Sequence, residues 1–175
     1  MMDEVWSLGY AYDRCYRSCW VGTKAEGTTI AHRNPIVSWF GEHTRITAIT
    51  TATLDGWVEQ MAAIGNSPAT INRKLATLSK VLTEASKRPA ESGLTSVPHI
   101  PRRKEYKGRI RWLTEAEEVG VVGYFAKRHK PKEYAVVRML LDTGMRLSEL
   151  WNLTHQDIDL HNGVIRIWEN KADLP

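Results

Sequence analysis

Residues 140–153, LLDTGMRLSELWNL, constrain the fold more than any other part of this chain, because they place an arginine inside a largely apolar stretch. The residues just before, 134–141, are mostly apolar and predict a buried helix. Thr143 and Gly144 predict the end of that helix, since glycine readily adopts the left-handed conformation found where helices close. The sequence therefore predicts a helix, a sharp break and a new element that begins with the arginine.

Arg146 is the arginine that opens this new element, which we expect to be a short helix. A guanidinium keeps its charge, so near a core it requires an anionic partner. Two partners fit: Glu149, three residues later in the same helix, or a phosphate held by the positive end of the helix. The residues of this segment leave both readings open. The side chains expected to face the core are Leu147, Leu150 and Leu153.

A hairpin and a further turn are expected after this helix. Asn162-Gly163 lies between two short strand-like runs, which is a strong hairpin signal. The next turn, residues 169–173, carries Lys171 at its tip. Taken alone, a lysine on a turn is most often a solvated surface residue.

The order of these elements (TGMRLSEL, a short helix, the residues DID, a hairpin and a lysine on a turn) resembles the phage integrase family of tyrosine site-specific recombinases. The resemblance implies that Arg146 clamps the scissile phosphate and that Lys171 acts as the general acid toward the leaving oxygen. It also implies DNA integration through a covalent phosphotyrosyl intermediate, with no cofactor and no metal.

The nucleophilic tyrosine and the H-x-x-R box of this family follow the turn lysine, whereas the sequence ends at Pro175. We therefore expect the front part of a recombinase, inactive alone. The alternative is a truncated, non-catalytic DNA-binding protein that occupies recombination sites or antagonises the full recombinase. An RNA-binding helical module would not explain the succession from TGMRLSEL to the lysine.

Positive charge is concentrated in one region of the chain. The overall net charge is +4, but residues 70–112 contain eleven Lys and Arg against three Glu. A local excess of this kind indicates a polyanionic partner, which the resemblance specifies as double-stranded DNA.

The helix expected from Ser67-Pro68 to Lys87 carries much of this charge. An apolar stripe formed by Ile71, Leu75, Leu78, Leu82 and Ala85 should face the core, with Thr77 and the basic residues opposite. Such a helix suits a duplex groove, although a solvated amphipathic helix is the simpler alternative. The residues predicted to bind DNA, on this helix and in the segment that follows it, are Arg73, Lys74, Lys80, Lys87, Arg102, Arg103 and Lys104.

The fold class expected is mainly α: a SAM-like helical core-binding domain (residues 1–95), a basic linker (96–111) and the start of an α+β tyrosine-recombinase catalytic domain (112–175). A capping box formed by Thr114 and Glu117 opens the last domain, with a helix to Lys127. The other helices of the first domain are expected from Val5 to Trp20, up to Phe40 with a start at Thr28, Thr29 or Asn34-Pro35, and from Thr50 or Thr51.

The composition indicates the cellular compartment expected for this chain. Its hydrophobic share of 42% supports packed cores, and no apolar run is long enough to span a membrane. We expect a cytoplasmic protein of a bacterial host, of phage or mobile-element origin, that self-associates on DNA in its full-length form. Cys15 and Cys19 should be reduced thiols, since no further ligands lie near them to complete a metal site.

Overall fold

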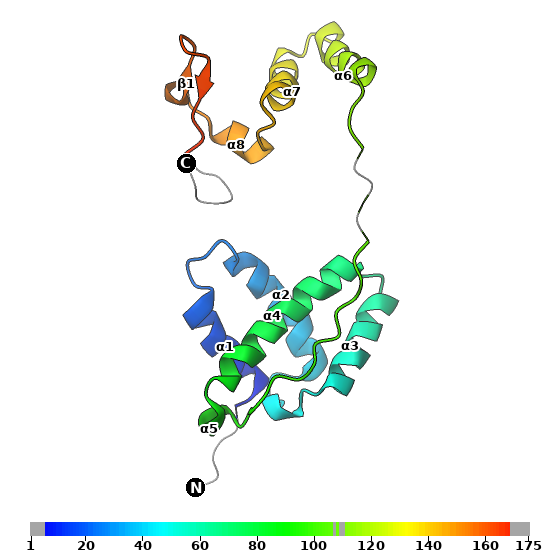
Figure 1. Cartoon of the computed structure of the whole chain (residues 1–175), viewed down its shortest axis with the longest axis vertical. Helices are drawn as coiled ribbons and strands as arrows, with labels where there is room; N and C mark the ends of the chain where they lie inside the picture. Colours follow the sequence, from blue (N-terminus) through cyan, green and yellow to red (C-terminus); the bar gives the residue numbers. More distant parts are fainter. Residues whose placement is uncertain (1–5, 107, 109–110, 169–175) are drawn as a thin grey trace. The chain divides into compact units, whose positions relative to one another are not determined.

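The computed structural model describes residues 6–106, 108 and 111–168 of the chain. It divides into two compact units, residues 1–107 and 108–175, and the boundary falls inside the segment predicted as a linker. Most described elements are helices, and the described strands form one small hairpin (Figure 1). No helix in the described part of the chain is both long and apolar enough to cross a membrane.

The first unit is a bundle of helices whose starts follow local capping chemistry. The hydroxyls of Ser7, Thr50 and Ser67 accept hydrogen bonds from amides in the first turns of three of the helices, as expected for N-caps. The predicted starts of the third and fourth helices are thereby confirmed. The elements are α1 (Leu8–Cys19), α2 (Glu26–Phe40), the 3-10 helix η1 (Ile46–Ala48), α3 (Thr51–Ala63), α4 (Pro68–Ser86) and α5 (Pro89–Ser92).

The starts predicted for α1 and α2 were wrong. Helix α1 begins at Leu8, because the backbone amide of Leu8 donates to the oxygen of Thr44 and the backbone oxygen of Trp6 accepts from the amide of Ile46, the first residue of η1. Helix α2 begins at Glu26 and continues through Pro35. The Glu26 carboxylate accepts hydrogen bonds from the hydroxyl of Tyr16 on α1 and from the amide of Gly22 in the turn after α1, so these contacts fix a start that no side-chain cap marks.

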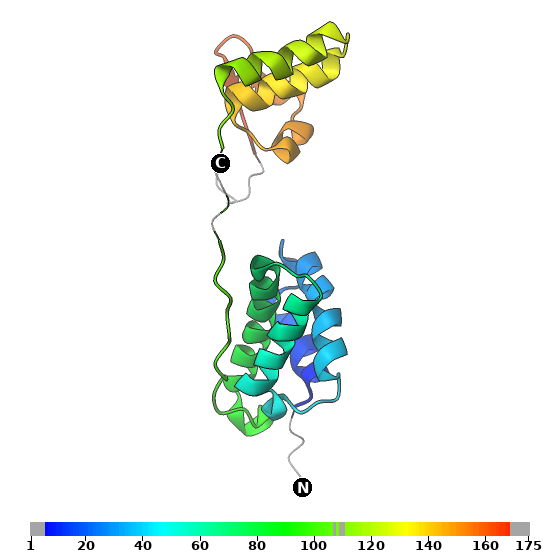
Figure 2. The same ribbon diagram turned by 90° about the vertical axis from the view of Figure 1, so that its right-hand side faces the viewer.

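Helix α4 is the centre of the first unit, and it packs against α1, α2 and α3 (Figures 1 and 2). Its predicted apolar stripe is confirmed, since each of the five side chains is 0 or 1% exposed. Each buried leucine contributes about 2 kcal/mol of transfer free energy. Thr77, predicted on the polar side, is instead buried where α2 packs on α4, and its hydroxyl lies 2.8 Å from Nδ1 of His32 on α2.

The chain after α5 runs back along α4 instead of leaving the unit at once (Figure 2). Leu94 is buried, and Val97 and Ile100 are partly buried against the core of the first unit. The segment is extended, as predicted for a linker, but most of its described length is docked on helices.

The second unit consists of a helix pair, a short helix and a hairpin. The capping box of Thr114 and Glu117 and the helix end at Lys127 are confirmed. Gly144 has φ of 67° and closes α7 as predicted. The elements are α6 (Glu115–Lys127), α7 (Pro131–Thr143), α8 (Leu147–Asn152), the 3-10 helix η2 (His155–Asp157), β1 (Ile158–Asp159) and β2 (Val164–Ile165).

Burial in the second unit is lower than the sequence predicted. Within the part described, only Met145 and Glu149 are buried, so the prediction that residues 134–141 are buried was wrong. Leu147, expected in the core, is 50% exposed. The apolar periodicity of α7 is real, but α7 makes its main described contacts with α6 and α8 alone, which cover too little of its surface.

Candidate nucleic-acid interface

The first turns of α4 present two cations, Arg73 and Lys74. Arg73 is exposed, and no carboxylate among the described residues pairs with it. Lys74 is half-buried and donates to Oδ1 of Asn66 at 3.2 Å, a neutral partner that leaves its charge uncompensated. Burial lowers the pKa of the nearby His32, and the charges of Lys74 and Arg73 lower it further. The electrostatic potential around this end of α4 is therefore positive.

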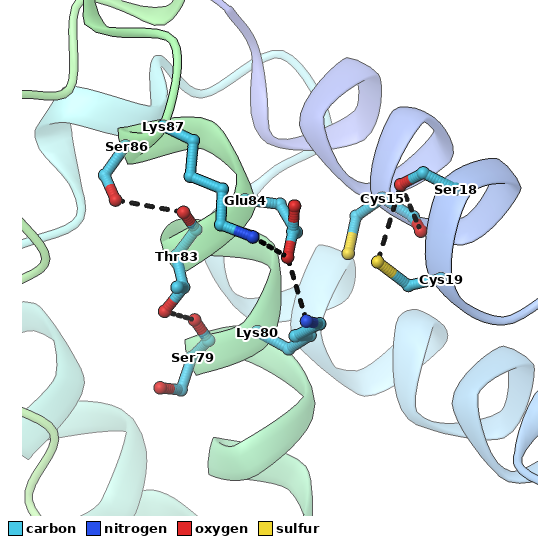
Figure 3. Close-up of polar contacts among 9 residues, drawn as sticks. All are labelled: Cys15, Ser18, Cys19, Ser79, Lys80, Thr83, Glu84, Ser86 and Lys87. Carbon is cyan, nitrogen blue, oxygen red and sulfur yellow. Dashed lines mark hydrogen bonds and ion pairs between the residues drawn. The ribbon is translucent and has the colours of Figure 1, made fainter.

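The other two cations predicted on α4, Lys80 and Lys87, share one carboxylate. Nζ of each lies 2.8 Å from Oε1 of Glu84 (Figure 3). Hydrogen bonds from Lys80 and then Lys87 lower the pKa of Glu84 from 4.5 to about 2. This end of the helix carries a smaller net charge than the basic face predicted, and the spacing of Glu84 four residues after Lys80 was the local signal for it.

The docked linker brings three more cations to the first unit. Arg102, Arg103 and Lys104 are exposed, and none has an acidic partner in the described part of the chain. Asn72 on α4 holds this segment: its Nδ2 donates to the backbone oxygen of Arg103 at 2.7 Å, and its Oδ1 accepts from the backbone amide of Arg103 at 2.9 Å. Sequence reasoning missed Asn72, whose only signal was a polar amide beside an apolar stripe.

In the second unit, Arg146 stands immediately before α8. Its guanidinium pairs with Oε1 of Glu149, and its backbone amide donates to Oε2 at 2.7 Å. These two contacts lower the pKa of Glu149, the backbone hydrogen bond contributing most. The pair with Glu149 is therefore present, yet the Arg146 side chain remains 59% exposed and keeps donors free for an anion.

The predicted hairpin is confirmed: β1 and β2 are antiparallel, with Asp159 opposite Val164 and Asn162-Gly163 in the connecting loop. Asp157, just before β1, accepts a hydrogen bond from Nε1 of Trp168 at 2.8 Å. Together with Glu149 and Arg166 these two residues line a hollow of about 400 Å³. Lys171, predicted on the next turn, lies outside the described residues.

The two cysteines lie on the side of α1 that faces α4 (Figure 3). Cys15 is buried, and this burial raises the pKa of its thiol to about 12. Cys19 is half-buried, and both are free thiols. Across the described ranges, no group of three or more His, Cys, Asp or Glu is placed to hold a metal ion.

Comparison with known proteins agrees with this arrangement. Residues 111–173 match the model of the phage integrase family. Over 147 residues the chain is 25% identical to the tyrosine recombinase XerC of Corynebacterium efficiens, a match that covers 82% of this chain and 47% of XerC. Over 76 residues it is 36% identical to the tyrosine recombinase XerA of Saccharolobus solfataricus, covering 42% of this chain and 24% of XerA.

The fold has a solved counterpart. The integrase of the Tn1549 transposon, in complex with transposon right end DNA, superimposes with a TM-score of 0.74 at 22% identity. The match covers 93% of this chain and 52% of that one, so the chain spans about half the length of this protein and of XerC.

A helical unit that precedes a second unit with an arginine after a Thr-Gly helix end is the arrangement expected from the resemblance to tyrosine recombinases. The match to the phage integrase family falls on residues 111–173, and the chain is similar to a tyrosine recombinase over most of its length. The predicted mainly α fold class is confirmed: a helical first unit is followed by a second unit whose described part consists of helices and a small hairpin.

Proposed function

We propose that this chain is the DNA-binding and phosphate-clamping region of an integrase that recombines DNA at specific sites. The observation that carries the proposal is the group of exposed cations without acidic partners on the first unit. The match to an integrase solved in complex with transposon DNA gives it further support. The cations, at the start of α4 and in the docked linker, are Arg73, Arg102, Arg103 and Lys104.

The proposed interface is not a continuous basic face along the whole of α4. Arg73, Lys74 and the linker cations form its main part. Lys80 and Lys87 contribute less, because Glu84 already compensates part of their charge. Contacts of this kind go to the phosphate backbone, so they fix the position of the protein on the duplex without reading its sequence.

A charge-matched pair of variants tests this interface. Arg73→Gln with Arg103→Gln should weaken binding to a fluorescein-labelled duplex and reduce the slope of log affinity against log salt by about 2, one unit for each phosphate that is no longer neutralised. The control, Arg17→Gln with Arg45→Gln, removes two exposed charges elsewhere on the first unit. Equal effects of the two variants would mean that net charge alone attracts DNA, and the assignment of the interface to Arg73 and Arg103 would be wrong.

For the chemistry, we propose that Arg146 neutralises the scissile phosphate. In the reaction implied by the family, a tyrosine hydroxyl attacks phosphorus and releases its proton to solvent, the bond from phosphorus to the 5′ oxygen breaks, and that oxygen takes a proton from Lys171. An exposed guanidinium held by Glu149 is suited to this task, because the ion pair orients it before the substrate arrives. Such electrostatic stabilisation is typically about 3 kcal/mol.

The alternative proposal is a protein that occupies recombination sites without cutting them. No tyrosine follows Arg146 in the 175 residues. A nicked duplex that traps covalent intermediates, followed by a denaturing gel, tests whether these residues can cut DNA by themselves. We expect a polypeptide of these residues to bind the duplex and form no adduct. A covalent adduct would show that an upstream tyrosine is the nucleophile and would overturn the roles proposed for Arg146 and Lys171.

A further inference from the structure

Asn72 lies on α4, where it is 8% exposed and uses both ends of its amide on the linker. It exchanges a pair of hydrogen bonds with the backbone of Arg103, and its Nδ2 also donates to Oε1 of Glu105 at 2.7 Å. A side-chain amide that pairs with the N–H and C=O of one residue imitates a partner strand. The contact therefore fixes the position of Arg103 along α4, which a merely apolar contact would not do.

Little else attaches this part of the linker. Residues 102–106 are exposed, and the last apolar side chain packed against the core before them is Ile100. Within the described part of the chain, every hydrogen bond from residues 101–106 to a helix of the first unit involves Asn72. If Asn72 lost its amide, the segment beyond Ile100 would be free to leave α4.

The three exposed linker cations lie on this segment. Asn72 is the neighbour of Arg73 in α4, so docking Arg103 at Asn72 brings the linker charges next to the charge of the helix. A free linker would have to be ordered each time it bound a polyanion, and that loss of entropy weakens binding. A docked linker has lost this freedom already.

We propose that Asn72 is a positioning residue that pins the linker to α4, so that Arg102, Arg103 and Lys104 form one preorganised phosphate-binding surface with Arg73. The attachment of the linker to Asn72 rests on the hydrogen bonds alone. Its role in DNA binding rests on the proposed function. Asn72 carries no charge and acts on DNA only through the linker.

The anchor is tested without DNA. Hydrogen exchange of the Arg103 amide, which donates to Asn72, should accelerate about tenfold or more in Asn72→Ala, because the closed state loses three hydrogen bonds. The matched control is Thr77→Val, which removes an equally buried polar contact of α4 that points to His32 instead of the linker. Unchanged exchange of the Arg103 amide in Asn72→Ala would overturn the anchor.

The effect on binding is tested by a double-mutant cycle with a labelled duplex at fixed salt. Asn72→Ala should weaken binding about fivefold in the natural chain. It should have no effect in a chain whose three linker cations are all replaced by Gln, because there are then no charges to position. Thr77→Val should leave affinity unchanged in both chains.

The binding and exchange experiments test the positioning role and the proposed function separately. An equal loss of affinity in both linker backgrounds would mean that Asn72 only stabilises the first unit, and the positioning role would be wrong. If the natural chain failed to bind the duplex, the proposed function would fail and the positioning role with it. Accelerated exchange at Arg103 would still show that the anchor exists in that case, so the two failures are distinguishable.

Discussion

Glu84 offers a test in which stability and DNA affinity should change in opposite directions. The change is Glu84→Gln, which removes the carboxylate shared by Lys80 and Lys87 (Figure 3). The pKa of Glu84, near 2 instead of 4.5, sets a ceiling of about 3 kcal/mol on the contribution of this carboxylate to the unfolding free energy. The two lysine side chains are 45% and 58% exposed. Solvent screens such pairs to about 0.5 kcal/mol each, so we expect a loss of about 1 kcal/mol.

The loss should depend on pH in a defined way. A lowered carboxyl pKa stabilises the folded state fully above the unfolded value of 4.5, and this stabilisation disappears as pH falls toward 2. The difference between wild type and Glu84→Gln should therefore be constant from pH 7 to about 5 and shrink below it. Native-state hydrogen exchange of the Leu75, Leu78 and Leu82 amides measures this stability difference within the first unit. The control is Glu59→Gln, which makes the same charge change at an exposed site on α3.

DNA affinity should rise in the same variant. Two lysines released from Glu84 can each contact a phosphate, so the slope of log affinity against log salt should steepen by up to about 2. Glu59→Gln should leave the slope unchanged. Equal stability of wild type and Glu84→Gln at pH 7 would refute the ion-pair reasoning. A loss of stability without a gain in affinity would show that Lys80 and Lys87 do not face the DNA.

Three further outcomes are expected. Thr50→Ala removes the N-cap hydroxyl of α3 and should lower the unfolding free energy by about 1 kcal/mol in urea titration; no change would mean that the cap is dispensable. Iodoacetamide at pH 8 should modify Cys19 well before Cys15, whose burial and pKa of about 12 keep its thiol neutral and covered; equal rates in peptide mass spectra would contradict that burial. In a recombinase that also carries the downstream tyrosine, Arg146→Ala should reduce DNA cleavage about a hundredfold and affinity by less than about threefold; undiminished cleavage would leave Arg146 only its pairing with Glu149.

Features set within one or two helical turns could be predicted from the sequence. The caps at Thr50, Ser67 and Thr114, and the helix end at Gly144, depend on side chains and backbone a few residues apart. The apolar stripe of α4 and the hairpin at Asn162-Gly163 follow from short periodicities in the same way. The resemblance at Arg146 rests on a contiguous motif, so it too required no tertiary information.

Tertiary structure decided which polar groups became anchors and which apolar faces became core. Tyr16 of α1 fixes the start of α2 at Glu26, and Asn72 ties a helix to a segment some thirty residues downstream. The face of α7 reads as core in the sequence but is only partly covered by the described elements. Periodicity states which side of a helix is apolar, but burial and hydrogen bonding depend on partners distant in the sequence, and the fold alone brings these together.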